Sequence, residues 1–196
     1  MKISIIIPCY NAEKWIEKCV ESALNQDYKN IEVIAVDNES TDNTLKILKN
    51  IKHKNFIVDV EKNIYPHCWD EARKKGFSLA SGKYLFTLAS DDFLDLRYIS
   101  RCMKYIMAAP DKIMAFQSPI RGVKGDQNVL VEEISHNYRT LSEFKQKSIS
   151  ACSVNSPTVV YNRKLFDDGL LETKPEIYSG AADYDLYCSL AESGVF

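Results

Sequence analysis

Short apolar runs alternate with amphipathic stretches through the first half of the chain. The runs have strand length and are rich in β-branched or aromatic residues, whereas the stretches repeat apolar positions every three or four residues, as helices do. This pattern predicts strands at residues 2–8, 31–36, 57–60 and 83–88, and helices at residues 12–25, 44–50 and 68–80. The alternation of strands and helices implies parallel strands joined by right-handed crossovers.

Local signals mark the ends of these elements. Asn11 precedes the first predicted helix and is expected to cap it, and Gly82 follows the third and is expected to supply a left-handed turn. The pattern weakens later, because between Arg121 and Ser150 only residues 129–134 alternate like an edge strand. On either side of that region we expect helices at residues 96–108, 163–167 and 183–193, and strands at residues 113–116 and 158–161.

The central predicted strand leads directly into two carboxylates. Asp91 and Asp92 follow residues 83–88 without an intervening glycine or proline. In open α/β sheets ligands bind at the carboxyl ends of strands, and adjacent carboxylates repel each other unless a cation, a helix terminus or solvent compensates them. One interpretation is therefore a Mg²⁺ or Mn²⁺ site that carries an anionic ligand. The other is a solvated turn that caps the next helix.

Composition and charge narrow the class of protein. The 196 residues are 45% hydrophobic, which suits one sizeable core and a single domain over residues 1–196. A net charge of −2 gives no general basic field of the kind that binds nucleic acid. The six cysteines show no Cys-x-x-Cys spacing, so we expect reduced thiols and a cytoplasmic protein. No signal peptide or membrane-spanning stretch occurs, which leaves peripheral attachment to the inner face of a membrane open.

Short motifs in a definite order extend over nearly the whole chain, at residues 4–11, 36–44, 72–76, 80–85, 90–92, 168–172 and 182–186. This ordered set resembles the inverting family 2 glycosyltransferases, which have the GT-A fold. The resemblance implies an α/β/α three-layer, Rossmann-like domain with a mixed, mostly parallel sheet. It also implies a nucleotide-binding half at residues 1–95 and an acceptor-side half at residues 96–196, in a protein that we expect to continue beyond Phe196.

The resemblance implies where a nucleotide would bind. Pro8, Tyr10 and Asn11 would lie beside the nucleotide, and Asp37 with Asn38 would contact its base, usually uracil. Asn38 stands where the family commonly has an aspartate, and the glutamate that follows it stands where the family commonly has a glycine.

The same resemblance assigns the chemistry to three acidic residues. Asp91 and Asp92 would hold the ribose and, through Mn²⁺ or Mg²⁺, the diphosphate, with Asp92 the first choice as metal ligand. Asp183, at the start of the last predicted helix, would be the catalytic base that takes the proton of the acceptor hydroxyl. These positions must therefore meet in one cleft. Ala89 and Ala182 stand where the family frequently has acidic residues.

Structural alternatives exist for several of these residues. Asp183 could simply cap its helix, because aspartate is favoured in a first turn whatever the function. Arg73 could meet the diphosphate of the nucleotide or pair with Asp70 or Glu71 at the surface. Trp69 is a candidate for stacking on the acceptor, yet a lone tryptophan is more often a packing residue.

Together these features predict a metal-dependent, inverting glycosyltransferase. It would move a sugar from a nucleotide diphosphate donor, most often UDP-linked, to a glycan or lipid-linked acceptor. An alternative is a non-catalytic domain that binds a nucleotide sugar, suggested by the alanines at positions 89 and 182. A nucleotidyltransferase would need a glycine-rich, basic loop after the first strand, which residues 8–13 lack.

Overall fold

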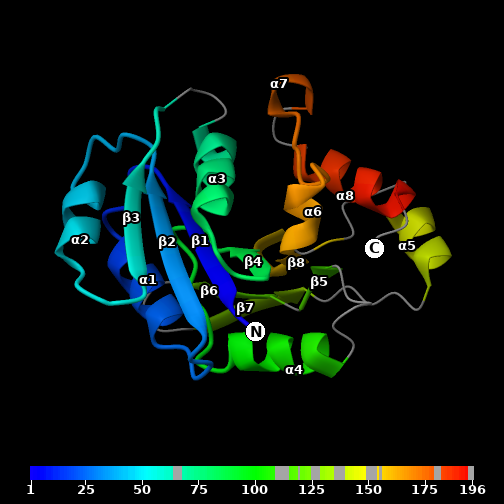
Figure 1. The fold of residues 1–196 in the computed structure, drawn as a ribbon, viewed down its shortest axis with the longest axis horizontal. Helices are drawn as coiled ribbons and strands as arrows, with labels where there is room; N and C mark the ends of the chain where they lie inside the picture. Colours follow the sequence, from blue (N-terminus) through cyan, green and yellow to red (C-terminus); the bar gives the residue numbers. More distant parts are fainter. Residues whose placement is uncertain are drawn as a thin grey trace.

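The structure of the chain is a computed structural model that describes residues 1–63, 68–108, 115–118, 120–124, 129–134, 140–148, 154, 156–178 and 182–193. Its main sheet has six strands in the order β3-β2-β1-β4-β8-β5 (Figure 1). Their bounds are β1 (Ile3–Cys9), β2 (Ile31–Asp37), β3 (Phe56–Val60), β4 (Tyr84–Thr87), β5 (Ala115–Phe116) and β8 (Val160–Asn162). The first four strands along the chain run parallel, and β8 is antiparallel to β4 and β5. The predicted α/β class with a mixed, mostly parallel sheet is confirmed.

Helices cover both faces of the sheet (Figure 1). On one face lie α1 (Ile16–Leu24), α2 (Thr44–Asn50) and α4 (Tyr98–Ala108), and on the other α3 (Cys68–Leu79), α5 (Leu141–Ser148), α6 (Arg163–Asp167) and α8 (Ala182–Glu192). The short helix α7 (Pro175–Tyr178) and the 3-10 turn η2 (Ser156–Thr158) complete the second half. Ile5 and Ile7 belong to the first core and Ile6 to the second, so β1 needs apolar side chains on both faces.

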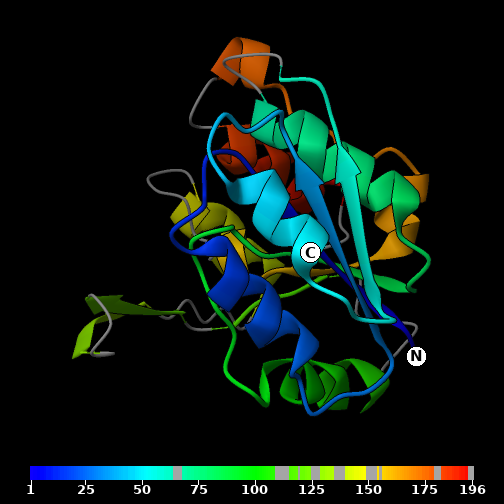
Figure 2. The same ribbon diagram turned by 90° about the vertical axis from the view of Figure 1, so that its left-hand side faces the viewer.

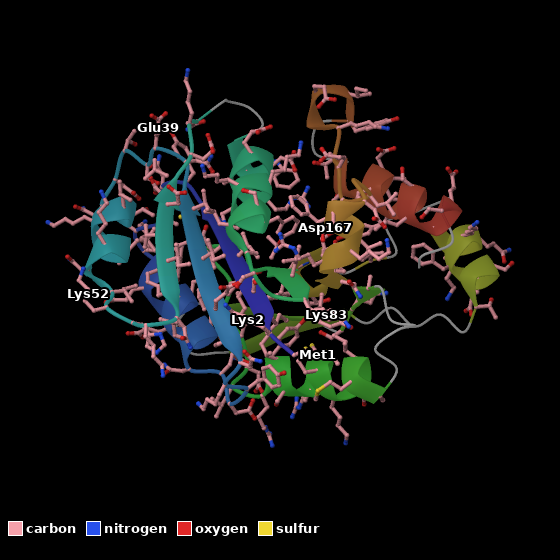
Figure 3. All side chains as sticks on the ribbon, in the orientation of Figure 1. Met1, Lys2, Glu39, Lys52, Lys83 and Asp167 are labelled. Carbon is pink, nitrogen blue, oxygen red and sulfur yellow. The ribbon has the colours of Figure 1, made fainter. Side chains whose placement is uncertain are left out.

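Parallel pairing brings the loops that follow β1, β2 and β4 to one edge of the sheet. Strand β1 pairs with β2 along its whole length and ends with Cys9 opposite Asp37. Figure 3 shows Glu39 at this edge, whereas Lys2 and Lys83 lie toward the opposite end of the strands. We call the edge that carries Glu39 the carboxyl edge.

The loops after β1 and β2 are hydrogen-bonded to each other, which overturns the expected role of Asn11. Helix α1 begins at Ile16 and has no side-chain cap, so the prediction that Asn11 caps it is wrong. Asn11 has a φ of 50°, and its Oδ1 accepts a hydrogen bond from the Thr41 N–H (2.8 Å). The next residue, Ala12, donates its N–H to Thr44 Oγ1 (2.7 Å). Polar partners in the neighbouring loop therefore replace the local cap.

At the opposite end of the strands, Gly82 permits a close backbone approach. It is not among the described residues with positive φ, unlike Gly169 (φ 72°), so the predicted left-handed turn at Gly82 is wrong. A Cβ there would lie 2.6 Å from Ser4 Oγ and 2.8 Å from the Ser4 backbone nitrogen. Beside it, the buried Glu32 carboxylate accepts hydrogen bonds from Ser4 Oγ (2.5 Å) and the Ser81 N–H (2.7 Å).

The described part of the second half contains four elements that the sequence pattern did not predict, namely one strand, helices α5 and α7 and the turn η2. The strand, β6 (Ile120–Lys124), pairs antiparallel with the expected strand β7 (Val129–Ile134), and this two-stranded sheet projects from the body in Figure 2. Of the strand expected at residues 113–116, positions 113 and 114 lie outside the described residues. In the described segments, every helix is too short or too polar to cross a bilayer.

Candidate active site

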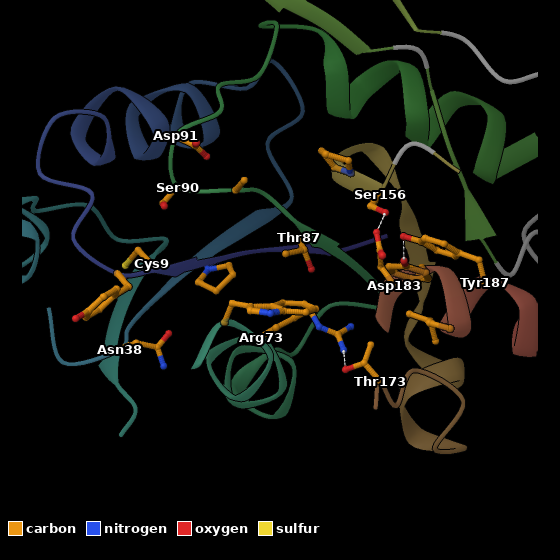
Figure 4. Close-up of a pocket in the computed structure, with 17 residues that line it drawn as sticks. Cys9, Asn38, Arg73, Thr87, Ser90, Asp91, Ser156, Thr173, Asp183 and Tyr187 are labelled. Carbon is orange, nitrogen blue, oxygen red and sulfur yellow. Dashed lines mark hydrogen bonds between the residues drawn. The ribbon is translucent and has the colours of Figure 1, made fainter. Parts of the chain in front are cut away.

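A cavity of about 360 Å³ opens at the carboxyl edge of the sheet, with walls from α3 and α8 (Figure 4). Segments from both halves of the chain line it, including the loops after β1, β2 and β4 and the turn η2. The lining residues that the sequence implicated are Pro8, Tyr10, Asn38, Arg73, Asp91 and Asp183. The fold thus brings Asp91 and Asp183, far apart in the sequence, to one cavity.

Three other predicted residues are not among those that line the cavity. Asn11 is exposed and engaged with the loop after β2. Asp37 is fully buried at the end of β2. Asp92 follows Asp91 on an exposed turn, in which its N–H donates to the Ala89 carbonyl (3.1 Å).

Unpaired polar atoms gather where β2 and β4 meet the cavity. Asn38 is only 1% exposed, and neither its amide nitrogen nor its amide oxygen has a partner in the described part of the chain. The same holds for Asp37 Oδ1 and Thr87 Oγ1, although Asp37 Oδ2 accepts the Ser40 N–H (3.0 Å). A buried polar group left unpaired costs about 1–3 kcal/mol. Asn38 and Thr87, which line the cavity, are therefore placed to gain most from a polar ligand.

The acidic pair after β4 provides two adjacent carboxylates. Partial desolvation and the charge of Asp91 both raise the pKa of Asp92. Among the residues that the structure describes, no three His, Cys, Asp or Glu side chains form a group that could hold a metal ion. Asp91 and Asp92 fit a divalent cation only if ligand oxygens and water complete its coordination, as is usual for Mg²⁺ bound with phosphates.

Arg73 is a buried cation in the cavity wall. Its guanidinium pairs with Asp70 (Nη2 to Oδ1, 2.7 Å) and also donates to the Leu171 carbonyl (3.2 Å) and Thr173 Oγ1 (3.3 Å). It also lies 5.2 Å from the centre of the Phe77 ring, within cation–π range. The expected pairing with Asp70 is present, but in the interior rather than at the surface. Within the described part of the chain, no hydrogen bond of Arg73 uses Nη1.

Asp70 carries the opposite charge beneath the cavity wall. Burial alone would raise its pKa, but the charge of Arg73 and a hydrogen bond from Thr173 lower it. Its second oxygen pairs with Lys74 Nζ (3.0 Å), which also reaches Glu172 (3.1 Å). Helix α3 is thus fastened by charged groups to the segment between α6 and α7.

Asp183 lies in the first turn of α8 with its carboxylate in the cavity (Figure 4). Oδ2 accepts a hydrogen bond from Ser156 Oγ (2.7 Å), and Oδ1 accepts the N–H of Tyr184 (2.8 Å). The carboxylate therefore has a local backbone contact as well as a place in the cavity. Asp185 does not line the cavity, and its carboxylate lies 3.9 Å from Lys174 Nζ.

Several residues that line the cavity carry no recognisable signal in the sequence. Ser156, Thr173 and Tyr187 belong to no motif, and their position depends on how distant segments cross. Trp69, for which the sequence leaves both acceptor stacking and packing open, is 41% exposed and lines the cavity beside Arg73.

Comparisons with known proteins agree with this architecture. The family model described as "Glycosyl transferase family 2" matches residues 4–170. A chondroitin synthase of Escherichia coli is 32% identical over 201 residues, covering 99% of this chain and 27% of the relative. The crystal structure of Staphylococcus aureus TarS 1–349 in complex with UDP has a TM-score of 0.71 and 26% identity, covering 97% of this chain and 54% of that one.

A mannosyltransferase of Pyrobaculum calidifontis, at 18% identity, shares the fold with a TM-score of 0.67 and covers 99% of this chain and 51% of that one. These structures confirm the expected GT-A fold. The chain spans about a quarter of the chondroitin synthase and about half of the TarS fragment.

Proposed function

Since the chain belongs to glycosyl transferase family 2, we propose that it transfers a sugar from a UDP-linked donor to a hydroxyl of a glycan or lipid-linked acceptor, with inversion at the anomeric carbon. The observation that carries this proposal is the presence of Asp91 and Asp183 in one cavity. A direct displacement needs a site for the leaving diphosphate and a base on the far side of the reacting carbon.

The unpaired atoms at the end of β2 support a uracil base. Uracil presents one N–H donor between two carbonyl acceptors. Asn38, which lines the cavity, offers an unpaired donor and an unpaired acceptor, and Asp37, the preceding residue, has an unpaired oxygen outside the cavity lining. The TarS structure was solved with UDP, which makes UDP our first choice of nucleotide.

We assign the diphosphate to the side of the cavity that carries Asp91. Asp91 and Asp92 would hold a Mn²⁺ or Mg²⁺ ion, whose charge would offset the negative charge that grows on the diphosphate as it leaves. Arg73 adds a fixed positive charge in the same cavity, and its Nη1 is available to a phosphate or sugar oxygen. Because Asp70 already holds the other side of the guanidinium, Arg73 is oriented before a ligand binds.

We assign the role of general base to Asp183. The hydrogen bonds from Ser156 and the Tyr184 N–H use one lone pair of each carboxylate oxygen and leave the others for an acceptor hydroxyl. A positioned base contributes about 10²- to 10⁴-fold to such a step. Asp185 is a poor substitute because it is directed to Lys174.

Two further proposals concern the acceptor and the compartment. The chondroitin synthase relative makes a polysaccharide acceptor our first choice, with a lipid-linked oligosaccharide second. We propose a cytoplasmic protein, in a compartment where thiols stay reduced, because Cys9, Cys19 and Cys102 are buried and free.

A ligand-binding experiment tests the donor site. Thermal stability of the full-length protein is measured with UDP, GDP and buffer alone, each with and without Mn²⁺. We expect UDP with Mn²⁺ to raise the melting temperature, because a ligand that binds only the folded state stabilises it. Asn38→Ala should reduce that shift. A shift with GDP and none with UDP would refute the uracil assignment.

A kinetic experiment tests catalysis against the non-catalytic alternative. UDP release is followed for wild type, Asp183→Asn and the matched control Asp185→Asn, which changes the same residue type one half-turn further along α8. We expect Asp183→Asn to lose about 10²- to 10⁴-fold in turnover with UDP binding retained, and Asp185→Asn to keep activity. Binding of UDP without turnover in wild type would favour a binding domain.

A further inference from the structure

Three hydroxyl groups, from Ser156, Tyr161 and Tyr187, lie close together next to Asp183. Ser156 Oγ lies 2.7 Å from Asp183 Oδ2, and the hydroxyls of Tyr161 and Tyr187 are 3.0 Å apart. Tyr187 also interacts with the Ser156 side chain. Figure 4 shows Ser156, Asp183 and Tyr187 together at one end of the cavity. These groups come from η2, β8 and α8, which meet at this point.

The hydrogen bond between Ser156 and Asp183 has a fixed direction. A hydroxyl has one hydrogen to donate, and the Ser156 hydrogen goes to the carboxylate, which can only accept when ionised. Between Tyr161 and Tyr187 either phenol can be the donor. The Ser156 hydroxyl dipole is thus aimed at Asp183, with the two phenols beside it.

The two tyrosines make this arrangement rigid. Tyr161 is 4% exposed and Tyr187 3% exposed, and both belong to the core between the sheet and helices α3, α6 and α8. Burial raises the pKa of both phenols, which keeps them protonated as hydrogen-bond donors. Ser156 itself is held at the start of η2, where its carbonyl accepts the Val159 N–H (3.4 Å).

We infer that Ser156, backed by Tyr187 and Tyr161, is a positioning residue that fixes the Asp183 carboxylate in the orientation needed to accept the proton of the acceptor hydroxyl. This inference rests on the proposed role of Asp183 as the base. An aspartate side chain has two rotatable bonds, and the Ser156 donor on Oδ2 acts together with the Tyr184 N–H on Oδ1 to fix both of them. Ser156 touches neither substrate nor donor in this scheme and acts through Asp183 alone.

The test compares Ser156→Ala, Ser156→Thr and Tyr187→Phe with wild type in the full-length protein. UDP release is measured with UDP-GlcNAc, UDP-glucose and UDP-glucuronate in the presence of Mn²⁺, using whichever supports turnover. A hydrogen bond to a charged group is worth about 1.5–3 kcal/mol, so we expect Ser156→Ala to lower kcat about 10- to 100-fold. KM for the donor should stay unchanged, and Ser156→Thr, which keeps the hydroxyl, should restore most of kcat.

Two further comparisons separate positioning from folding. Tyr187→Phe should lower kcat a few-fold in wild type but have no effect in the Ser156→Ala background, because Tyr187 acts only through Ser156. Tyr98→Phe is the matched control: it removes another phenol that donates to this turn, at the Thr158 carbonyl (2.8 Å), without belonging to the three hydroxyl groups next to Asp183. It should lower the melting temperature and leave kcat unchanged.

Each outcome decides the inference. Independent, additive losses for Ser156→Ala and Tyr187→Phe, or a loss with Tyr98→Phe equal to that with Ser156→Ala, would show general destabilisation and overturn it. Unchanged kcat in Ser156→Ala, while Asp183→Asn is inactive, would overturn it and leave the proposed function intact. Absence of turnover in wild type with all three donors would overturn both.

Discussion

Replacing Glu32 with glutamine tests how the sheet is held at the end opposite the cavity. The Glu32 carboxylate accepts hydrogen bonds from Lys2 Nζ (2.6 Å), Ser4 Oγ (2.5 Å) and the Ser81 N–H (2.7 Å). Burial alone would raise its pKa, but these hydrogen bonds lower the pKa from 4.5 to about 2. A glutamine would keep the shape and lose the charge, so the substitution isolates the ionised group.

The sign and size of the effect follow from that pKa. Because the pKa is lower in the folded state, ionised Glu32 stabilises the fold above pH 4.5, and the contribution is lost as the pH falls toward 2. At about 1.4 kcal/mol per pKa unit the full shift corresponds to about 3 kcal/mol. The Lys2 side chain is 37% exposed, so solvent screens part of this energy. We expect Glu32→Gln to lower the free energy of unfolding by about 2 kcal/mol at pH 7.

Urea denaturation of wild type and Glu32→Gln in steps from pH 7 to pH 3 measures this difference. We expect it to be constant down to about pH 5 and to shrink at lower pH. Glu21→Gln, which changes an exposed glutamate on α1, serves as control and should stay within about 0.5 kcal/mol of wild type. A loss that is the same at pH 7 and pH 3 would mean that the charge contributes nothing and that glutamine merely packs badly.

Other substitutions test the backbone and the cavity. Gly82→Ala should cost about 3 kcal/mol in thermal unfolding because its Cβ meets the Ser4 backbone, whereas Gly169→Ala, with open space around it, should cost about 1 kcal/mol for its positive φ alone. Glu39→Gly should raise stability by up to about 1 kcal/mol, since Glu39 has a φ of 53°, and no gain would show that its hydrogen bond to Asn63 outweighs the strain. Trp69→Ala should raise KM for the acceptor about 10-fold in the transfer assay, with Trp69→Phe closer to wild type. Equal KM values for the acceptor in Trp69→Ala and Trp69→Phe would mean that Trp69 has a structural role.

The strands were predictable because both their faces are buried. An apolar run without alternation needs helices on either side, so residues 2–8 and 31–36 indicated the layered α/β class before any contact was known. The ends of elements were less predictable, because partners distant in sequence compete with local ones. Asn11 bonds to Thr41 rather than to its own helix, and Gly82 is required by Ser4 of a different strand.

The residues of the candidate site likewise fall into those that the sequence predicted and those that it did not. Asp91 and Asp183 were found because they sit in ordered motifs at a strand end and a helix start. Ser156 and Trp69 were not assigned, because a serine or a tryptophan has no distinctive spacing and acquires a role only from the segments that fold beside it. Helix α5 and strand β6 were missed for a related reason: their sequences lack a periodic apolar face strong enough to predict an element.

The bonds between the loops after β1 and β2 have a consequence for redesign. Besides Asn11 and Thr41, Glu13 donates its N–H to Asp42 (3.1 Å), and its carboxylate accepts the Asn43 N–H (3.0 Å). Neither loop can be lengthened or shortened without breaking its hydrogen bonds to the other. A change of nucleotide preference would therefore have to come from substituting single side chains while both loops keep their length and backbone path. Grafting a loop of different size would not achieve it.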